Sequence, residues 1–367
     1  DQGESGMAIR SAAKHRKSRP VSRVRVGFRR WTGMLAPVLA VATVAAMAGG
    51  GGASAAVENP NPTVMVGGDP QGVAVDPDGK HVYVASFAEN AIRVIDTDSK
   101  RVVGSVRTGA GPRGIAVDSD SRRAFVTNFN ENSVSVIDTA NGKLIRNVAV
   151  GQNPAGVAVF GRDRYLLVTN YYGNTVSIID SAKLELIDTL AVGVNPDGVA
   201  IDPKGEFAYV ANSGSNTVSV IDIKEEQVVR TVAVGAVPQK VAIDPDGRHA
   251  YVTNYGDHTL SVIDLPTEIG LDVYNTLLGV NNVIAVGINP RGLAVARDSR
   301  HAFVVNVGED TLHVIDTEQG RVIGTAYVGF SPDEVAVGPD STAYITARGD
   351  GTVTVLRRDF VATPAGT

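Results

Sequence analysis

The sequence contains no cysteine, and its single tryptophan, Trp31, lies close to the N-terminus. Without cysteine the chain has no disulfide, no thiolate metal site, no nucleophilic thiol and no attachment point for a c-type haem. Aromatic residues are scarce, at 5% of 367 residues, and charged residues amount to 20%. The 40 glycines and the 43% hydrophobic fraction nevertheless give a globular composition, which excludes a disordered chain.

Charge is distributed unevenly along the chain. Residues 1–56 hold nine Lys or Arg and two acids, whereas residues 57–367 hold 25 Lys or Arg and 37 Asp or Glu. Residues 57–367 are therefore acidic, and they lack the net positive charge that is typical of a nucleic-acid-binding protein, although a local basic patch is still compatible with this balance.

Residues 1–56 have the order of parts that is typical of an export signal peptide. A basic region ends at Arg29 and Arg30, the apolar run 34–48 follows, and Ala53-Ser54-Ala55 resembles a cleavage site. The run is shorter than the roughly 20 residues of a membrane span, so cleavage is favoured over an uncleaved anchor. We therefore expect a mature chain of residues 57–367, exported to the cell envelope or beyond by the Sec or the twin-arginine route. No later stretch is long and apolar enough to span a membrane.

One sequence unit is repeated seven times after this segment. A proline followed by a short apolar stretch recurs every 42 residues, with one interval of 52, at Pro70, Pro112, Pro154, Pro196, Pro238, Pro290 and Pro332. In the fourth copy, four β-branched stretches alternate with period two between turn residues: 199–201, 208–211, 217–221 and 228–234. We name these strands a, b, c and d. Four antiparallel strands in each of seven units predict an all-β fold, a seven-bladed β-propeller.

The two ends of the repeat region predict how the ring closes. The last copy has strands a to c, ending near Leu356, but no recognisable strand d. Residues 63–67, before the first copy, match strand d of the fourth copy at 231–235. The N-terminal strand is therefore expected to complete the last blade, which removes a free sheet edge.

The b strands carry the motif that identifies a family resemblance. They include 125–128, Phe-Val-Thr-Asn, and 251–254, Tyr-Val-Thr-Asn, and the c strands have the pattern Val-Ser-Val-Ile-Asp. The chain resembles the YVTN-repeat β-propellers of secreted bacterial and archaeal surface proteins over residues 63–356. Related seven-bladed propellers include lactonases, redox-enzyme domains and binding scaffolds, so the resemblance implies the fold and leaves the activity open.

The loops that follow strands d and b share one face of the expected propeller, which we call the top face. The residue after each repeat proline varies along the chain: Gln71, Arg113, Ala155, Asp197, Gln239, Arg291 and Asp333. Two hypotheses fit these loops, a solvated rim with aromatic packing between blades and a binding mouth for a small anionic or polyhydroxylated ligand. The candidate ligand-binding residues are basic or aromatic: Arg113, Lys240, Arg291, Arg348, Phe87, Phe129, Tyr171, Tyr172 and Tyr255.

The remaining motifs favour structural roles. His81, His249 and His301 occupy the same repeat position in three units, and His258 and His313 occupy two others, so the histidines do not cluster as a metal site requires. The aspartates that end the c strands are periodic, as turn-forming residues are. Gly109–Gly114 matches G-x-G-x-x-G but joins two strands, whereas a dinucleotide site needs a strand followed by a helix. We therefore expect no cofactor, no metal and no catalytic residue.

The leading functional hypothesis is a secreted, monomeric, non-enzymatic scaffold that binds a ligand or a protein partner at the top face. The alternatives are a lactonase-like hydrolase at that face, and a binder of single-stranded DNA that stacks bases on aromatic side chains. The fifth unit also carries about ten extra residues within 265–282, which are unusually apolar for a loop. This insertion is expected either to fold back on its own blade or to provide a docking surface.

Overall fold

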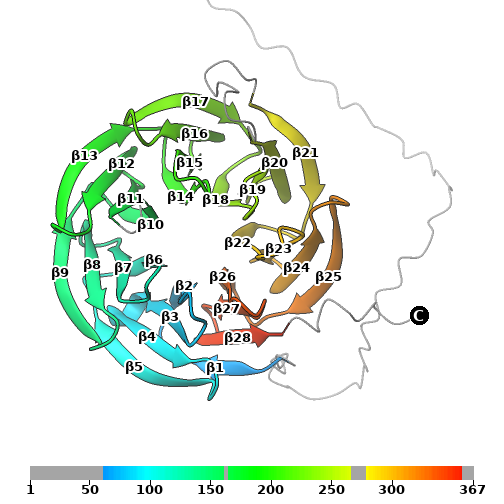
Figure 1. Cartoon of the computed structure of the whole chain (residues 1–367). Coiled ribbons are helices and arrows are strands. Elements are labelled where there is room, and N and C mark those ends of the chain that lie inside the picture. Colours follow the sequence, from blue (N-terminus) through cyan, green and yellow to red (C-terminus); the bar gives the residue numbers. More distant parts are fainter. Residues whose placement is uncertain (1–60, 161–163, 266–277, 358–367) are drawn as a thin grey trace, which may run out of the picture. The chain divides into compact units, whose positions relative to one another are not determined.

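The computed structural model describes residues 61–160, 164–265 and 278–357, and Figure 1 shows them as a ring of blades around a central axis. They contain 28 strands and one short 3-10 helix, Phe87–Glu89, and no helix among them is long and apolar enough to cross a bilayer. The predicted export segment 1–56 and most of the insertion, 266–277, lie outside the described residues.

The strands form seven sheets of four antiparallel strands, so the predicted seven-bladed propeller is confirmed. Blade 1 comprises β2 (Pro70–Val75), β3 (His81–Ser86), β4 (Ala91–Asp96) and β5 (Arg101–Arg107). Blade 2 comprises β6 (Pro112–Val117), β7 (Arg123–Asn128), β8 (Ser133–Asp138) and β9 (Lys143–Ala149). Blade 3 comprises β10 (Pro154–Phe160), β11 (Tyr165–Asn170), β12 (Thr175–Asp180) and β13 (Glu185–Ala191).

Blade 4 comprises β14 (Pro196–Ile201), β15 (Phe207–Asn212), β16 (Thr217–Asp222) and β17 (Gln227–Ala233). Blade 5 comprises β18 (Pro238–Ile243), β19 (His249–Asn254), β20 (Thr259–Asp264) and β21 (Val280–Ala285). Blade 6 comprises β22 (Pro290–Val295), β23 (His301–Asn306), β24 (Thr311–Asp316) and β25 (Arg321–Tyr327). Blade 7 comprises β26 (Pro332–Val337), β27 (Ala343–Ala347), β28 (Thr352–Leu356) and β1 (Thr63–Met65).

The ring closes as the sequence predicts. Strand β1 pairs with β28 in the register Thr63 to Thr354 and Met65 to Thr352, beside each other in Figure 1. Val64 and Val66 are 5% and 3% exposed and pack in a cluster with residues of blades 1 and 7. The first strand therefore joins the two ends of the chain through backbone hydrogen bonds and apolar packing.

The hydrophobic core lies between blades. Each apolar cluster takes its residues from two neighbouring sheets, as where Tyr209 and Val220 of blade 4 pack with Val241 and Ala250 of blade 5. The core lies there because strands b and c consist largely of apolar residues and are buried on both faces. Leu265 and Leu278, at the described ends of the insertion, also join this cluster.

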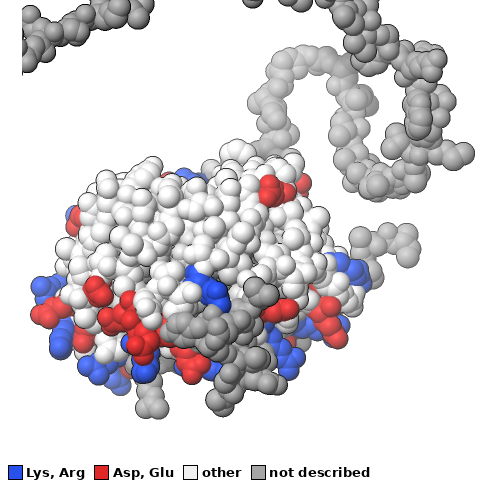
Figure 2. Space-filling model, turned by 90° about the horizontal axis from the view of Figure 1, so that it is seen from above, with Lys and Arg blue, Asp and Glu red and all other residues white. Residues whose placement is uncertain are grey.

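The two faces of the propeller differ in charge. In the side view of Figure 2, Lys, Arg, Asp and Glu gather on one half of the surface, and the other half is nearly free of them. In blade 4 the a–b and c–d turns, 203–206 and 223–226, hold two and three charged residues, whereas the top loops 192–195 and 213–216 hold none. The charged half is therefore the bottom face.

Candidate functional site

The innermost strands, one from each blade, present two rings of residues to the central axis. The upper ring consists of the residues that follow the repeat prolines, and the lower ring consists of the next residues along the chain. Five of the lower-ring residues are glycines, and a Cβ at Gly198 would lie 2.8 Å from the carbonyl oxygen of Gln239 in the next blade. Glycine is needed because the backbones approach too closely for a side chain. Lys240 and Glu334 replace glycine in the other two blades.

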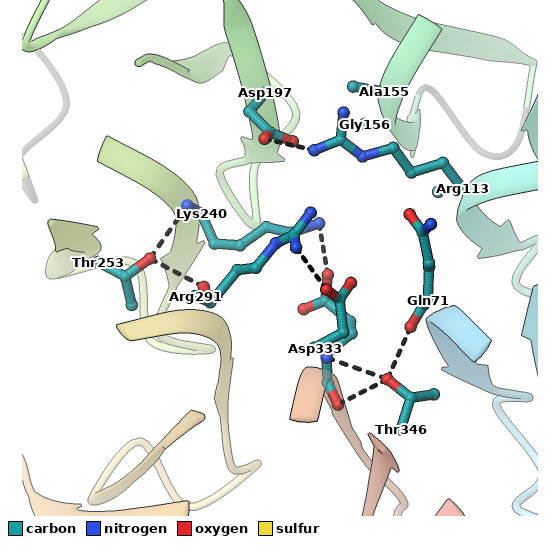
Figure 3. Close-up of polar contacts among 12 residues, drawn as sticks. Gln71, Arg113, Ala155, Gly156, Asp197, Lys240, Thr253, Arg291, Asp333 and Thr346 are labelled. Carbon is teal, nitrogen blue, oxygen red and sulfur yellow. Dashed lines mark hydrogen bonds and ion pairs between the residues drawn. The ribbon is translucent and has the colours of Figure 1, made fainter. Parts of the chain in front are cut away.

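The threonine of the Val-Thr-Asn motif joins the innermost strands of adjacent blades. Thr169 accepts a hydrogen bond from the Gly156 amide at 2.8 Å and donates one to the carbonyl of Asp197 in the next blade at 2.6 Å. Thr253 links Lys240 to Arg291 in the same way, as Figure 3 shows. This repeated buried bond fixes the backbone positions from which the channel side chains project.

A cavity of about 390 Å³ opens at the top face. Eight of the nine candidate residues line it: Phe87, Arg113, Phe129, Tyr171, Tyr172, Tyr255, Arg291 and Arg348. Four further residues complete the lining: Gln71, Asp197, Val237 and Gln239. We call this cavity the mouth. Its volume lies near the lower end of the roughly 300–1,000 Å³ of small-molecule sites, so it fits a compact ligand.

Lys240, the ninth candidate, lies one level deeper. It lines a second cavity of about 170 Å³ together with Glu334 and four of the five lower-ring glycines. Its Nζ lies 2.5 Å from Glu334 Oε2, across the channel from blade 5 to blade 7. Burial raises the pKa of Glu334, and the ion pair with Lys240 opposes that rise. We call this deeper cavity the lower chamber.

Arg113 and Arg291 are held by acids of the upper ring. Arg113 Nη2 lies 2.7 Å from Asp197 Oδ2, and Arg291 Nη1 lies 2.5 Å from Asp333 Oδ1 (Figure 3). Burial lowers the pKa of Arg291, but the carboxylates of Asp333 and Asp197 outweigh it and hold that pKa above its ordinary value. Both guanidiniums are therefore fixed cations whose charge is largely matched by acids.

Arg348, in the top loop of blade 7, makes two contacts with Asp69. Its Nε lies 2.6 Å from Asp69 Oδ1 and its Nη2 lies 3.3 Å from Asp69 Oδ2. Sequence reasoning missed Asp69. The available signal was its position, since it is the one acid at the residue before the repeat proline, where Asn153, Asn195 and Asn289 stand in other blades.

Aromatic rings gather at blades 2 and 3. Tyr171 and Tyr172 pack edge to face with centroids 5.0 Å apart, and Phe129 lies 6.3 Å from each of them. The guanidinium of Arg113 lies 5.1 Å from the centre of the Phe129 ring. Tyr172 stays 58% exposed. The predicted convergence of basic and aromatic side chains at the top face is therefore observed, with acids interleaved among them.

The other polar repeats have structural partners. Asp96, Asp138 and Asp222 each accept the backbone amide three residues ahead, which is the turn role predicted for them. Three histidines pair with acids beside the a–b turns: His81 with Asp76, His249 with Asp244 and His301 with Asp298. Within the described ranges, no group of three or more His, Asp or Glu side chains is arranged to hold a metal ion.

Comparison with known proteins agrees with this architecture. The family model described as "YNCE-like beta-propeller" matches residues 60–162 and 158–248. No curated protein matches the chain. Hydrazine synthase of Kuenenia stuttgartiensis is similar over 84% of this chain and 100% of that one, with 19% identity and a TM-score of 0.70.

Two other solved structures are similar. The Cps50 (Swd1) β-propeller domain of Myceliophteria thermophila has 11% identity and a TM-score of 0.71, over 80% of this chain and 98% of that one. A functionally unknown protein of Desulfotomaculum acetoxidans has 18% identity and a TM-score of 0.62, over 71% and 86% of the two chains. At such identities the structures share the fold alone. The matched family model and the seven observed blades together identify the chain as a member of the YNCE-like β-propeller family.

Proposed function

We propose that this chain is a non-enzymatic binding scaffold that takes a small anionic or polyhydroxylated ligand in the mouth of its top face. The observation that carries the proposal is the mouth itself, where aromatic faces and fixed polar groups from several blades line a single cavity of about 390 Å³. Concave sites with apolar walls and a few convergent polar groups are the usual form of small-molecule sites.

The arrangement of the polar groups supports binding more than catalysis. Each acid at the mouth is engaged by an arginine, as in the pairs Arg113–Asp197 and Arg348–Asp69. A hydrolase needs a group that can take up a proton from water in the reaction, and the described residues that line the mouth do not include His, the usual one. The same mouth serves a scaffold because fixed donors and acceptors orient a ligand without reacting with it.

The proposal is tested by measuring the thermal unfolding of the full chain with a panel of anionic metabolites, neutral sugars, sugar lactones and single-stranded DNA. A ligand at about 100 times its dissociation constant adds roughly 2.7 kcal/mol, which raises the unfolding midpoint. Tyr172→Ala and Arg348→Ala, both at the mouth, should reduce that rise. Arg248→Ala, an exposed arginine beside the a–b turn of blade 5, is the matched control and should leave it unchanged.

A rise of unchanged size in both mouth variants would contradict the site. Turnover of a lactone in the same samples would replace the scaffold with the hydrolase. A rise with single-stranded DNA that collapses steeply with added salt would indicate the nucleic-acid alternative instead.

We also infer that the chain acts outside the cytoplasm, because its N-terminal region has the basic, apolar and small-residue order of a signal peptide. Expression of the full sequence in a bacterial host, followed by mass determination of exported protein, should find a chain that begins near residue 57. Retention of an uncleaved chain in the cell would contradict export.

A further inference from the structure

The charges around the channel balance one another. In the described part of the chain, the four candidate cations at the mouth and lower chamber are each within 2.7 Å of an acid: Arg113 with Asp197, Arg291 with Asp333, Arg348 with Asp69, and Lys240 with Glu334. A free anion would have to compete with these carboxylates, and separating a buried ion pair leaves an uncompensated buried charge. The cluster therefore offers little net attraction to an anionic ligand.

One hydrogen-bond acceptor at the mouth, a carboxylate oxygen of Asp197, lacks a donor. Asp197 is 2% exposed, and while its Oδ2 holds Arg113, its Oδ1 is buried and has no hydrogen-bond donor among the described residues. A carboxylate oxygen only accepts, and a buried acceptor without a donor is costly. Asp197 lines the mouth, so a ligand that carries donors and displaces the groups covering this oxygen can satisfy it, whereas an anionic group brings acceptors alone.

Each ion pair also presents donors and acceptors side by side. Arg113 carries five N–H groups, and only its Nη2 contacts Asp197 within 2.7 Å. The same holds for Arg291 beside Asp333, where Nη1 makes the contact. A ligand with adjacent hydroxyls, each of which both donates and accepts, matches these neighbouring N–H donors and carboxylate acceptors better than a ligand that only donates or only accepts.

An exposed aromatic face adjoins these polar groups. Tyr172 is 58% exposed and is braced by Tyr171 and Phe129, so its ring is held in place. A flat apolar surface beside the polar groups of the upper ring suits a ligand ring that has an apolar face and a polar edge.

We propose that the mouth recognises a neutral, ring-shaped polyhydroxylated ligand, the chemistry of an uncharged saccharide unit, with its ring face on Tyr172 and its hydroxyls toward the Arg113–Asp197 and Arg291–Asp333 pairs. This inference rests on the proposed function and selects one of its two ligand classes.

The test compares one sugar ring in three charge states by calorimetric titration of the full chain. The probes are glucose, glucuronate and glucosamine, with galactose and galacturonate as a second neutral and anionic pair. A neutral sugar should bind at least several-fold more tightly than its uronate and than the amino sugar. Tyr172→Ala should weaken that binding by about 3- to 10-fold through loss of ring stacking. Met65→Ala, at an exposed position of outer strand β1, is the control and should not change it.

Asp197→Asn provides a second readout. It removes one negative charge beside Arg113 and leaves the guanidinium available, so the preference should move from the neutral sugar toward the uronate. Because Tyr172 is exposed, Tyr172→Ala keeps the test valid if Asp197→Asn fails to fold.

The outcomes separate the two proposals. Tighter binding of a uronate or of glucosamine by the unmodified chain, weakened in Tyr172→Ala, would overturn this inference and support the mouth as the binding site. Absence of binding by every sugar would also overturn it. If no compound of the wider panel binds in a manner that depends on Tyr172 or Arg348, the proposed function fails as well.

Discussion

Arg113 of blade 2 reaches past blade 3 and donates to Asp197 of blade 4, with 2.7 Å between Nη2 and Oδ2. Blade 3 allows this because Ala155, its residue of the upper ring, is small and 2% exposed. The pair joins two non-adjacent blades across the channel, so it ties the ring together as well as shaping the mouth.

Removal of either member of this pair should destabilise the fold. Arg113→Ala leaves Asp197, whose side chain is 2% exposed, without its partner, and the expected loss is about 3–5 kcal/mol. Arg113→Ala with Asp197→Ala should cost less than the sum of the single changes, because no charge is then left unpaired. Urea unfolding followed by circular dichroism measures all four proteins. Simple additivity would mean that the two residues are not coupled.

The threonine bridge gives a second prediction. Thr169→Val keeps the shape of the side chain but leaves the Gly156 amide and the Asp197 carbonyl without the shared hydroxyl. The expected loss is about 1–3 kcal/mol. Thr169→Ser retains the hydroxyl and should lose less, as judged by the same urea titration. Equal losses for the two variants would assign the effect to packing.

Val237 holds a backbone conformation that suits other residues better. Its φ is 53°, in the left-handed region that β-branched residues rarely adopt, and blades 3, 4 and 6 have asparagine at this position. Asn153 and Asn195 also donate to a carbonyl of the preceding blade, Phe129 and Tyr171 respectively.

Val237→Asn should therefore raise stability by about 1 kcal/mol, measured as a higher urea midpoint with an unchanged slope. Because Val237 lines the mouth, ligand affinity should be measured on the same protein. A fall in stability would show that the apolar contacts of Val237 outweigh its backbone strain.

Ring closure can be tested at two adjacent residues of β1. Val64 is 5% exposed, whereas Met65 points outward and is 68% exposed. Val64→Asp buries a charge in the seam between the first and last blades and should cost several kcal/mol or prevent folding. Met65→Asp should change the unfolding free energy by no more than about 0.5 kcal/mol. Similar thermal midpoints for the two variants would contradict the closure of the ring by this strand.

His313 predicts a loss of stability in acid. Burial lowers the pKa of His313 below its ordinary value of 6.5, and nearby Glu309 opposes this only in part. Below pH 6.5 the unfolded chain then binds a proton that the folded chain excludes, so this contribution to stability falls as the pH drops through that value.

The matched variant is His313→Ser, which introduces the serine that blade 4 has at this position. There Ser219 accepts a hydrogen bond from Asn212 at 2.9 Å. The difference in unfolding free energy between the variant and the unmodified chain should grow from pH 7 to pH 5. A constant difference would show that His313 does not titrate between these pH values.

The repeat pattern predicts the fold and most of the residues that line the mouth. Strands, turns and ring closure depend on local patterns and on pairing between neighbours, and both repeat with the 42-residue spacing from Pro70 to Pro112. The same spacing places the residues after each proline in one ring and the loops after the b strands on the same face, which is why eight of the nine candidate residues line the cavity.

Only the tertiary structure decided how the charges pair and at which depth they lie. Arg113 and Asp197 are 84 residues apart, and Arg348 and Asp69 are 279 apart. Their contacts depend on the diameter of the ring and on the direction of each side chain, which the repeat does not encode. The depth of Lys240 likewise follows from a one-residue step along its strand, which moves the side chain from the mouth to the lower chamber.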